Sequence, residues 1–185
     1  GGADSVTHRS VADVAQVPLG SLTYYFESRE DLIREAFRLY IAEAMAFLQE
    51  LQRDVPPSTP TGLVDMILEL MAREFASPDS VRAEYEMILH AARDRTVALE
   101  FAAWERSMEE QLAASLSAMG TPQPQSAART IVQLVRGSEI VQIAGRSESP
   151  RDLRNRLLTV VNALIPAEKA APQARTVPAN RRSTR

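Results

Sequence analysis

The side chains best placed to hydrogen-bond a partner lie in one short stretch near the N-terminus. Within positions 18–26 stand Gly20, Ser21, Thr23 and Tyr24. Hydroxyl groups can donate to phosphate oxygens and base edges, and glycine lets a backbone approach closely. At about 100° per residue, Gly20 and Tyr24 share one side of a helix, with the two smaller hydroxyl residues on its flanks. These residue types favour contact with a nucleic acid.

Two short helices and a tight turn must position this surface. Val11, Val14 and Ala15 recur at the three- and four-residue spacing of one apolar helical face. Pro18 is expected at the first position of a second helix, where its fixed φ fits and its missing N–H costs nothing. The apolar back of that helix is expected to consist of Pro18, Leu22, Tyr25 and Phe26. A packed back and a polar front are what a recognition helix needs.

The stretch 6–32 resembles the helix-turn-helix signature of the tetracycline repressor (TetR) family of transcriptional regulators. The resemblance is carried by turn, core and surface positions together: Thr7, Val11, Ala12, Ala15, Val17, Gly20, Ser21, Leu22, Tyr25, Phe26, Ser28, Arg29 and Leu32. Three positions depart from the family pattern. Gln16 replaces the usual turn glycine, Leu19 a common lysine and Thr23 a frequent tyrosine.

The resemblance also implies a supporting helix ahead of these residues. Gly1 to Asp4 cannot supply it, so the first helix is expected to be missing from the sequence as given. The backs of the two short helices should then be partly exposed, and DNA binding by this chain should be weak.

DNA contacts follow from the resemblance and from helical position. The residues expected at phosphates lie at helix starts and at the end of the second helix: Thr7, Tyr25 and Arg29. The residues expected to read or closely approach base edges lie on the front of the second helix: Gly20, Ser21, Thr23 and Tyr24.

A second candidate for chemistry is a column of Glu86, His90 and Asp94, spaced one helical turn apart. Two carboxylates and one imidazole make a weak metal site, and a charged, solvated helix face is much the commoner explanation. Cysteine is absent, which excludes disulfides, thiolate zinc sites and a cysteine nucleophile. The sequence also has no nucleophile–base signature and no phosphate loop. We therefore expect no enzyme, no metal and no cofactor.

Composition and the signals for helix starts and ends predict an all-α protein. Hydrophobic residues make up 45% and charged residues 24% of the sequence, with a net charge of −3, which is ordinary for a globular protein. Ser28 and Asp31 form a potential capping box at the start of a long helix reaching about Arg53. Ser/Thr-Pro pairs at 59–60, 77–78 and 149–150 mark later helix starts. The later helices are expected at 61–76, 79–93, 96–119, 125–145 and 151–165.

The prolines at 56–60 divide the chain into two expected domains. Residues 1–53 would form the helix-turn-helix domain with its connecting helix, and 58–166 a helical ligand-binding and dimerisation domain. Residues 167–185 lack apolar periodicity and are expected to be a disordered tail. No apolar run approaches the roughly 18 residues of a membrane span, and no signal peptide is recognisable. A cytoplasmic location without a membrane partner is the default expectation.

Methionine and aromatic side chains could line an apolar pocket among the helices of 61–119. Such stripes more often form a plain core, which the residues alone favour, but the resemblance implies a small-molecule pocket, because regulators of that family usually enclose one there. The side chains expected to contact a small apolar or amphipathic ligand are Met71, Phe75, Tyr85, Phe101, Trp104 and Met108.

The helix at 125–145 is apolar on more than one side, so both sides must be buried. A second copy of the chain could cover one side, as in the resembled family, where two helices from each chain form the dimer. Deep burial within one chain is the alternative. The expected interface residues are Ile131, Leu134, Val135, Ser138, Val141, Leu157 and Val161.

Together these features predict a dimeric, ligand-responsive transcriptional regulator. Two reading helices would enter successive major grooves of a pseudo-palindromic double-stranded DNA operator. A ligand would act through the long helix, change the spacing of the two units and release a repressor from the operator. The alternative is a helical dimeric protein-interaction module without specific DNA binding.

Overall fold

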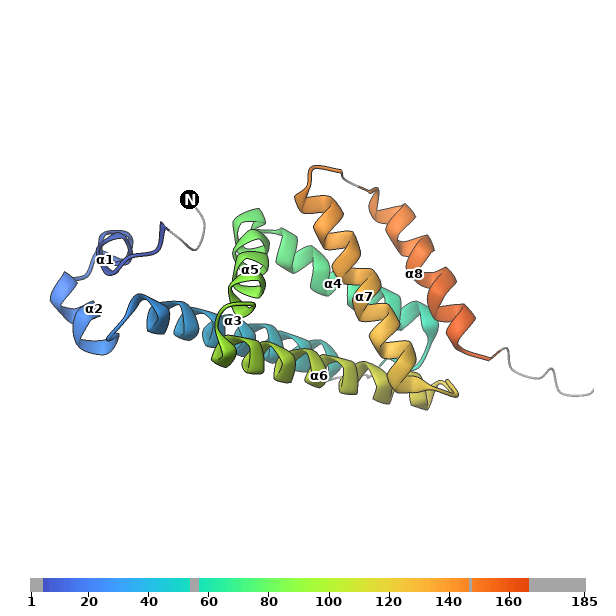
Figure 1. The fold of residues 1–185 in the computed structure, drawn as a ribbon. Coiled ribbons are helices and arrows are strands. Elements are labelled where there is room, and N and C mark those ends of the chain that lie inside the picture. The colour runs from blue at the N-terminus through green and yellow to red at the C-terminus, as the bar shows by residue number, and fades with distance from the viewer. Residues whose placement is uncertain (1–4, 54–56, 147, 167–185) are drawn as a thin grey trace, which may run out of the picture.

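The structure is a computed structural model that describes residues 5–53, 57–146 and 148–166. These residues form eight α-helices and no strand, which confirms the all-α prediction (Figure 1). The helices are α1 (His8–Ala15), α2 (Leu19–Tyr25), α3 (Arg29–Arg53), α4 (Pro60–Phe75), α5 (Pro78–Ala91), α6 (Arg95–Ala118), α7 (Pro124–Ile143) and α8 (Pro150–Leu164). The expected tail at 167–185 lies outside the described residues.

The long helix α3 organises the molecule. The two short helices α1 and α2 lie at its N-terminal end, away from α4 to α8, and α6 runs beside it (Figure 1). The main core lies between α4, α6, α7 and α8, with Leu63, Leu116 and Leu157 fully buried. Within the part of the chain that is described, no helix is long and apolar enough to cross a membrane.

The helix-turn-helix unit, residues 5–27, is held by local hydrogen bonds and a small core. Thr7 caps α1 in a capping box with Ser10. Gln16 ends α1 in the left-handed conformation at φ 55°, which explains why a glycine would suit this turn. Ala12 and Leu22 pack against Leu32 of α3.

Two details of α2 differ from the expectation. Pro18 is the N-cap of the helix and not its first helical residue. Tyr25 is 75% exposed, so the apolar back consists of Leu22 and Phe26 without it. The helix is short and contacts little of the protein. Its last turn is therefore exposed even on the side that the periodicity predicted to be buried.

The starts of the longer helices confirm the capping predictions in most cases. The Ser28 N–H donates to the Asp31 carboxylate and the Asp31 N–H donates to the Ser28 hydroxyl, each at 3.1 Å, and α3 then continues to Arg53. Thr59 and Ser149 cap α4 and α8 by accepting hydrogen bonds from the Gly62 and Asp152 N–H groups. Ser77 makes no side-chain cap bond, although α5 still begins at Pro78.

Candidate nucleic-acid interface and ligand cavity

The front of α2 is a solvent-exposed surface. Gly20, Ser21 and Tyr24 are all exposed, and a Cβ added at Gly20 would meet no atom within 4 Å. Tyr24 and Tyr25 are 81% and 75% exposed, and their rings meet edge to face at 5.1 Å. The Thr23 hydroxyl donates back to main-chain carbonyls of its own helix. The structure thus brings together the residues that were expected to approach base edges.

The residues expected at phosphates take part in internal contacts. The Thr7 hydroxyl accepts from the Ser10 N–H at 3.0 Å. The Arg29 Nε donates to the Val6 carbonyl at 3.0 Å, and its guanidinium also pairs with Glu30. Arg29 therefore ties the start of α3 to the segment before α1. A phosphate contact from Arg29 would have to share or replace these bonds.

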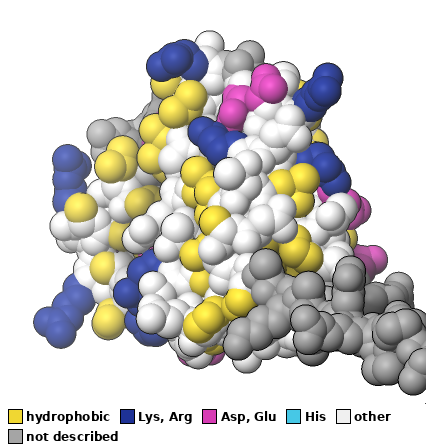
Figure 2. Space-filling view, turned by 90° about the vertical axis from the view of Figure 1, so that its right-hand side faces the viewer, with side chains coloured by type: hydrophobic (Ala, Val, Ile, Leu, Met, Phe, Trp, Pro, Cys, Tyr) yellow, Lys and Arg dark blue, Asp and Glu magenta, His cyan; other side chains and the backbone are white. Residues whose placement is uncertain are grey.

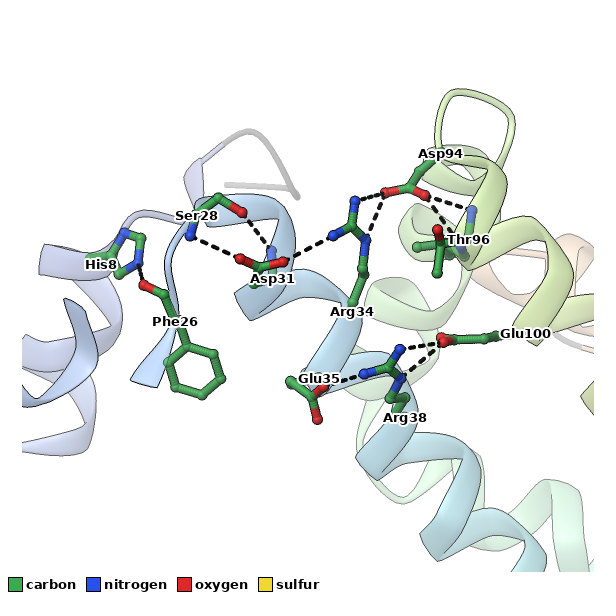
Figure 3. Close-up of polar contacts among 11 residues, drawn as sticks. His8, Phe26, Ser28, Asp31, Arg34, Glu35, Arg38, Asp94, Thr96 and Glu100 are labelled. Atoms are coloured by element: carbon green, nitrogen blue, oxygen red, sulfur yellow. Dashed lines mark hydrogen bonds and ion pairs between the residues drawn. The ribbon is translucent and has the colours of Figure 1, made fainter. Parts of the chain in front are cut away.

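His8 holds α1 to the end of α2. Its Nε2 lies 2.9 Å from the Phe26 carbonyl oxygen (Figure 3). The short helices use this ring as a cross-link, because their own core is small.

The charge of the helix-turn-helix unit is net negative, which does not favour binding of a polyanion such as DNA. Residues 5–32 contain two arginines, Arg9 and Arg29, and four acidic residues: Asp13, Glu27, Glu30 and Asp31. Most DNA affinity comes from cations that neutralise phosphates. Contacts by this unit would thus depend more on hydroxyl and main-chain groups than on charge.

The back of the helix-turn-helix unit is partly open. A groove of about 740 Å³ separates it from α5. Its apolar lining includes Val6, Val11, Phe26 and Leu32, with Met87 on the α5 side.

A separate cavity lies between α3, α4, α6 and α7. It encloses about 80 Å³. Its walls are mostly aliphatic and include three methionines, Met66, Met71 and Met108. The polar side chains that line it are Glu74, Gln111, Arg136 and Glu139.

Of the six side chains expected at a ligand, Met71 and Met108 line this cavity. Phe75 packs against the main core instead. Phe101 and Trp104 belong to an aromatic cluster with Phe37 of α3, at ring separations of 5.7–6.4 Å. Helical periodicity placed these residues on the apolar faces of their helices but could not predict which other helix each face would contact.

The polar end of the cavity continues into a buried group of charges, here called the carboxylate cluster: Glu74, Glu84, Arg136 and Glu139. Glu84 is fully buried and Glu139 is 2% exposed. The Arg136 guanidinium pairs with both of them and lies 5.0 Å from the centre of the Trp104 ring.

Two tyrosines complete the carboxylate cluster. The Tyr40 hydroxyl of α3 donates to Glu84 of α5. The Tyr85 hydroxyl, expected at a ligand, donates to Glu139 of α7 at 2.7 Å. The cluster therefore links α3, α5 and α7 through hydrogen bonds shielded from water, where each bond is stronger than at the surface.

Burial and mutual repulsion govern the ionisation of the cluster. Burial, with added repulsion from Glu139 and Glu84, raises the pKa of Glu74 to about 8. Burial also raises the pKa of Glu84, although Arg136 and the Tyr40 hydroxyl oppose it. Three carboxyl groups lie around one guanidinium, which pairs with two of them, so full ionisation would leave excess negative charge in a poorly solvated place.

The sequence analysis missed this cluster, although a signal was present. Glu139 follows Val135 by four residues, Arg136 follows Val132 by four, and Glu74 follows Leu70 by four. Charged side chains that continue an apolar stripe at helical spacing are candidates for burial.

A second set of ion pairs joins the start of α3 to the start of α6. Arg34 contacts the capping-box carboxylate of Asp31 at 2.9 Å and Asp94 at 3.1 Å (Figure 3). Asp94 is also the N-cap of α6 and accepts from the Thr96 and Val97 N–H groups. Burial opposes ionisation of Asp94, but these two hydrogen bonds and Arg34 bring its pKa below the usual value.

One turn further along, Arg38 binds Glu100 of α6 with two nitrogens, at 2.9 and 2.7 Å (Figure 3). Arg34 and Arg38 thus connect α3 to the first turns of α6 at two levels.

The Glu86, His90 and Asp94 column does not form a metal site. Asp94 faces Arg34, and His90 is half-buried with its Nε2 unpaired. Across the described ranges, no group of three or more His, Asp or Glu side chains could hold a metal ion.

Most residues expected at a dimer interface are buried in this chain's own core. Ile131, Leu157 and Val161 are at most 1% exposed, so they cannot present a surface. Ser138 is also buried and accepts a 2.7 Å bond from Arg156. α8 covers this side of α7. These four residues are therefore buried within one chain, which was the alternative to a dimer interface.

The remaining expected interface residues lie nearer the surface. Leu134 and Val135 are half-buried, with Val135 lining the cavity, while Val141 is 43% exposed. Beside Val141, Ile140 and Ile143 are also exposed, so the C-terminal part of α7 has an apolar strip. On the face toward α8, hydrophobic side chains are interspersed with basic ones (Figure 2).

Comparisons with known proteins agree with this architecture. Residues 58–167 match the family described as "Tetracyclin repressor-like, C-terminal domain". A comparison with curated protein sequences gives no match.

Solved structures are similar over nearly the whole chain. A transcriptional regulator from Rhodococcus sp. Rha1 has a TM-score of 0.76 at 20% identity, over 87% of this chain and 86% of its own. A TetR transcription regulator from Haloarcula marismortui has a TM-score of 0.75 at 15% identity, over 88% and 89%. A TetR family member from Streptomyces coelicolor has a TM-score of 0.66 at 26% identity, over 90% of both chains.

The raised pKa of Glu74 predicts a pH-dependent stability. The folded chain keeps a proton that an unfolded glutamate, with a pKa near 4.5, releases, so this stabilisation is complete below that pKa and is lost as pH rises through about 8. As the pH rises from 5 to 8.5, the free energy of unfolding should fall by about 1–2 kcal/mol less in Glu74→Gln than in the unmodified chain. Urea unfolding followed by helical circular dichroism measures this. Glu69→Gln, at an exposed position of the same helix, should behave like the unmodified chain.

Proposed function

The chain belongs to the tetracycline repressor-like family of DNA-binding transcriptional regulators, which are not enzymes, and from this premise we propose that it is a ligand-responsive repressor. In this proposal α2 reads the major groove of an operator, and a small molecule in the α3–α4–α6–α7 cavity releases it. The observation that carries the proposal is that α3 contributes both to the support of α2 and to the wall of the cavity, through Leu32 and Leu48 respectively.

A continuous set of contacts supports communication between the cavity and α2. Met108 lines the cavity and packs against the aromatic cluster, in which Trp104 contacts Phe37 and Tyr40 of α3. A ligand that displaced the wall of α6 would therefore act on the middle of α3. Arg34 and Arg38 connect the same two helices near the DNA-reading end.

The ligand must bind one arrangement of α3 and α6 better than the other, because equal affinity for both would shift nothing. The ion pairs of Arg34 are suited to distinguish two arrangements. Asp94 holds both Arg34 and the first N–H groups of α6, so a movement of α6 along α3 would change the Arg34 contacts.

We assign the partner-facing surface of a homodimer to the exposed strip of Ile140, Val141 and Ile143. A dimer would place two copies of α2 on a pseudo-palindromic site about one helical turn apart. Gly137 supports close helix approach, since a Cβ there would meet nothing within 4 Å in its own chain.

One observation favours the alternative of an interaction module that does not bind specific DNA. The acidic excess of residues 5–32 gives little attraction to phosphates. Binding to DNA from upstream of its own coding sequence, compared with scrambled DNA over a salt series, separates the two functions. A clear preference for the upstream DNA supports the repressor, and equal weak binding supports the module.

Gly20→Ala tests the placement of α2 on DNA. The added methyl meets no protein atom, so the fold should be kept and α2 slightly favoured. Close approach to the groove should be blocked, and affinity for the upstream DNA should fall about tenfold or more. Fluorescence anisotropy with labelled DNA measures the loss, with the thermal melt and the solution mass as controls. Unchanged affinity would contradict this placement.

Ile140→Glu tests the dimer surface. A charge in an apolar interface is costly, so the variant should sediment as a monomer at micromolar concentration while the unmodified chain sediments as a dimer. Leu99→Glu replaces a similarly exposed leucine on α6 and should leave the dimer intact. If both variants remain dimeric, the interface lies elsewhere.

Arg34→Gln tests the link between the cavity and α2. Val135→Phe, which fills the cavity as a ligand would, should weaken DNA binding in the unmodified chain. In the Arg34→Gln background the same substitution should have a several-fold smaller effect, because the link between α3 and α6 is lost. DNA affinities of the four proteins form a double-mutant cycle. Additive effects of the two substitutions would contradict the link.

A further inference from the structure

The cavity has two chemically different ends. Along α4 and α7 its walls are aliphatic, with Leu70, Ile131 and Val132 among the lining residues. The other end contains Glu74 and Glu139, which lie close to each other, and the Arg136 guanidinium. A molecule that fills such a space needs an apolar body and one polar group.

The pairing of the charges shows which sign of ligand charge the polar end would attract. Arg136 is engaged with Glu84 and Glu139. Glu74 approaches Glu139, and among the described residues no cation forms an ion pair with it. Arg73, the adjacent residue in the chain, instead stacks on Phe47 with its guanidinium 3.9 Å from the ring centre. The cavity therefore presents a carboxyl pair in need of a positive charge or a shared proton.

Resting on the proposed ligand-responsive function, we propose that the cavity selects small apolar molecules that carry a protonated amine. The ammonium group would lie between Glu74 and Glu139, and the apolar body would lie along the methionine-containing wall. An ammonium has three donors, and the oxygens of two carboxyl groups can accept them.

The chemistry of the site also predicts what it excludes. A carboxylate ligand would add negative charge beside Glu74, Glu84 and Glu139, with one guanidinium already shared by two of them. A neutral hydroxyl could bond one carboxylate but would leave the charge excess unchanged. The raised pKa of Glu74 is a further sign that this end lacks positive charge.

The size of the cavity limits the ligand. About 80 Å³ is less than the 300–1,000 Å³ of typical ligand sites, so binding must displace side chains. Met66, Met71 and Met108 can do this, because an unbranched thioether adapts to irregular shapes at little cost. A narrow aliphatic chain is consequently a better probe than a rigid polycyclic molecule.

The experiment compares octylamine, octanol and octanoate, which share an alkyl chain and differ in head group. Trp104 is the only tryptophan and contacts both Arg136 and the aromatic cluster, so its fluorescence reports occupancy. Calorimetry on the unmodified chain gives the three affinities independently. We expect octylamine to bind at least about tenfold more tightly than octanol, and octanoate to bind most weakly.

Glu74→Gln and Glu139→Gln should each remove most of the advantage of octylamine over octanol, while Glu69→Gln, outside the cavity, should keep it. Binding of octanol or octanoate at least as tight as that of octylamine would overturn the amine preference and leave the proposed repressor function standing. If none of the three probes bound by either method, the cavity would not be a ligand site, and the ligand-responsive function would fall with it. If the amine preference persisted in both Gln variants, these carboxylates would not be its source.

Discussion

The structure depends on the continuity of α3. This single helix of 25 residues, about 37 Å long, begins beside the helix-turn-helix unit and ends at the linker to α4. Leu32 near its start packs under α2, Phe37 is fully buried against α6, and Leu48 lines the cavity. Because an unbroken helix transmits displacement along its length, a change at one of these contacts affects the others. The small core of α1 and α2 has little packing of its own with which to resist such a change.

The carboxylate cluster is an unusual means of joining α3 to the helical domain. A buried ion pair seldom stabilises a fold more than well-packed apolar residues of the same volume, since each charge loses its hydration. Here the Tyr40 bond to Glu84 and the Arg136 bonds to Glu84 and Glu139 connect three helices at the edge of a cavity. An apolar contact at this place would respond to the shape of a ligand alone. A charged contact would respond to both the shape and the charge of such a ligand.

Much of the fold could be predicted from the sequence because helix starts are local. Capping by Ser28, Thr59 and Ser149 needs only neighbouring residues, and those three helices begin at the predicted positions to within a residue. The cavity could be predicted only in part. Periodicity marked Phe101 and Trp104 as apolar, but their packing on α3 depends on tertiary arrangement. The pairing of Glu84 with Arg136, more than fifty residues apart, was likewise beyond local reasoning.

Asp94 shows how local and tertiary roles combine in one side chain. One carboxylate oxygen caps α6 through Thr96 and Val97, and the other accepts from Arg34 of α3. The negative carboxylate is favoured by the positive end of the α6 dipole and by the guanidinium together. Any shift of α6 that lengthens the Arg34 contact leaves the cap intact, since the cap moves with its helix. The start of α6 can therefore change its relation to α3 without unwinding, as the proposed link between the cavity and α2 requires.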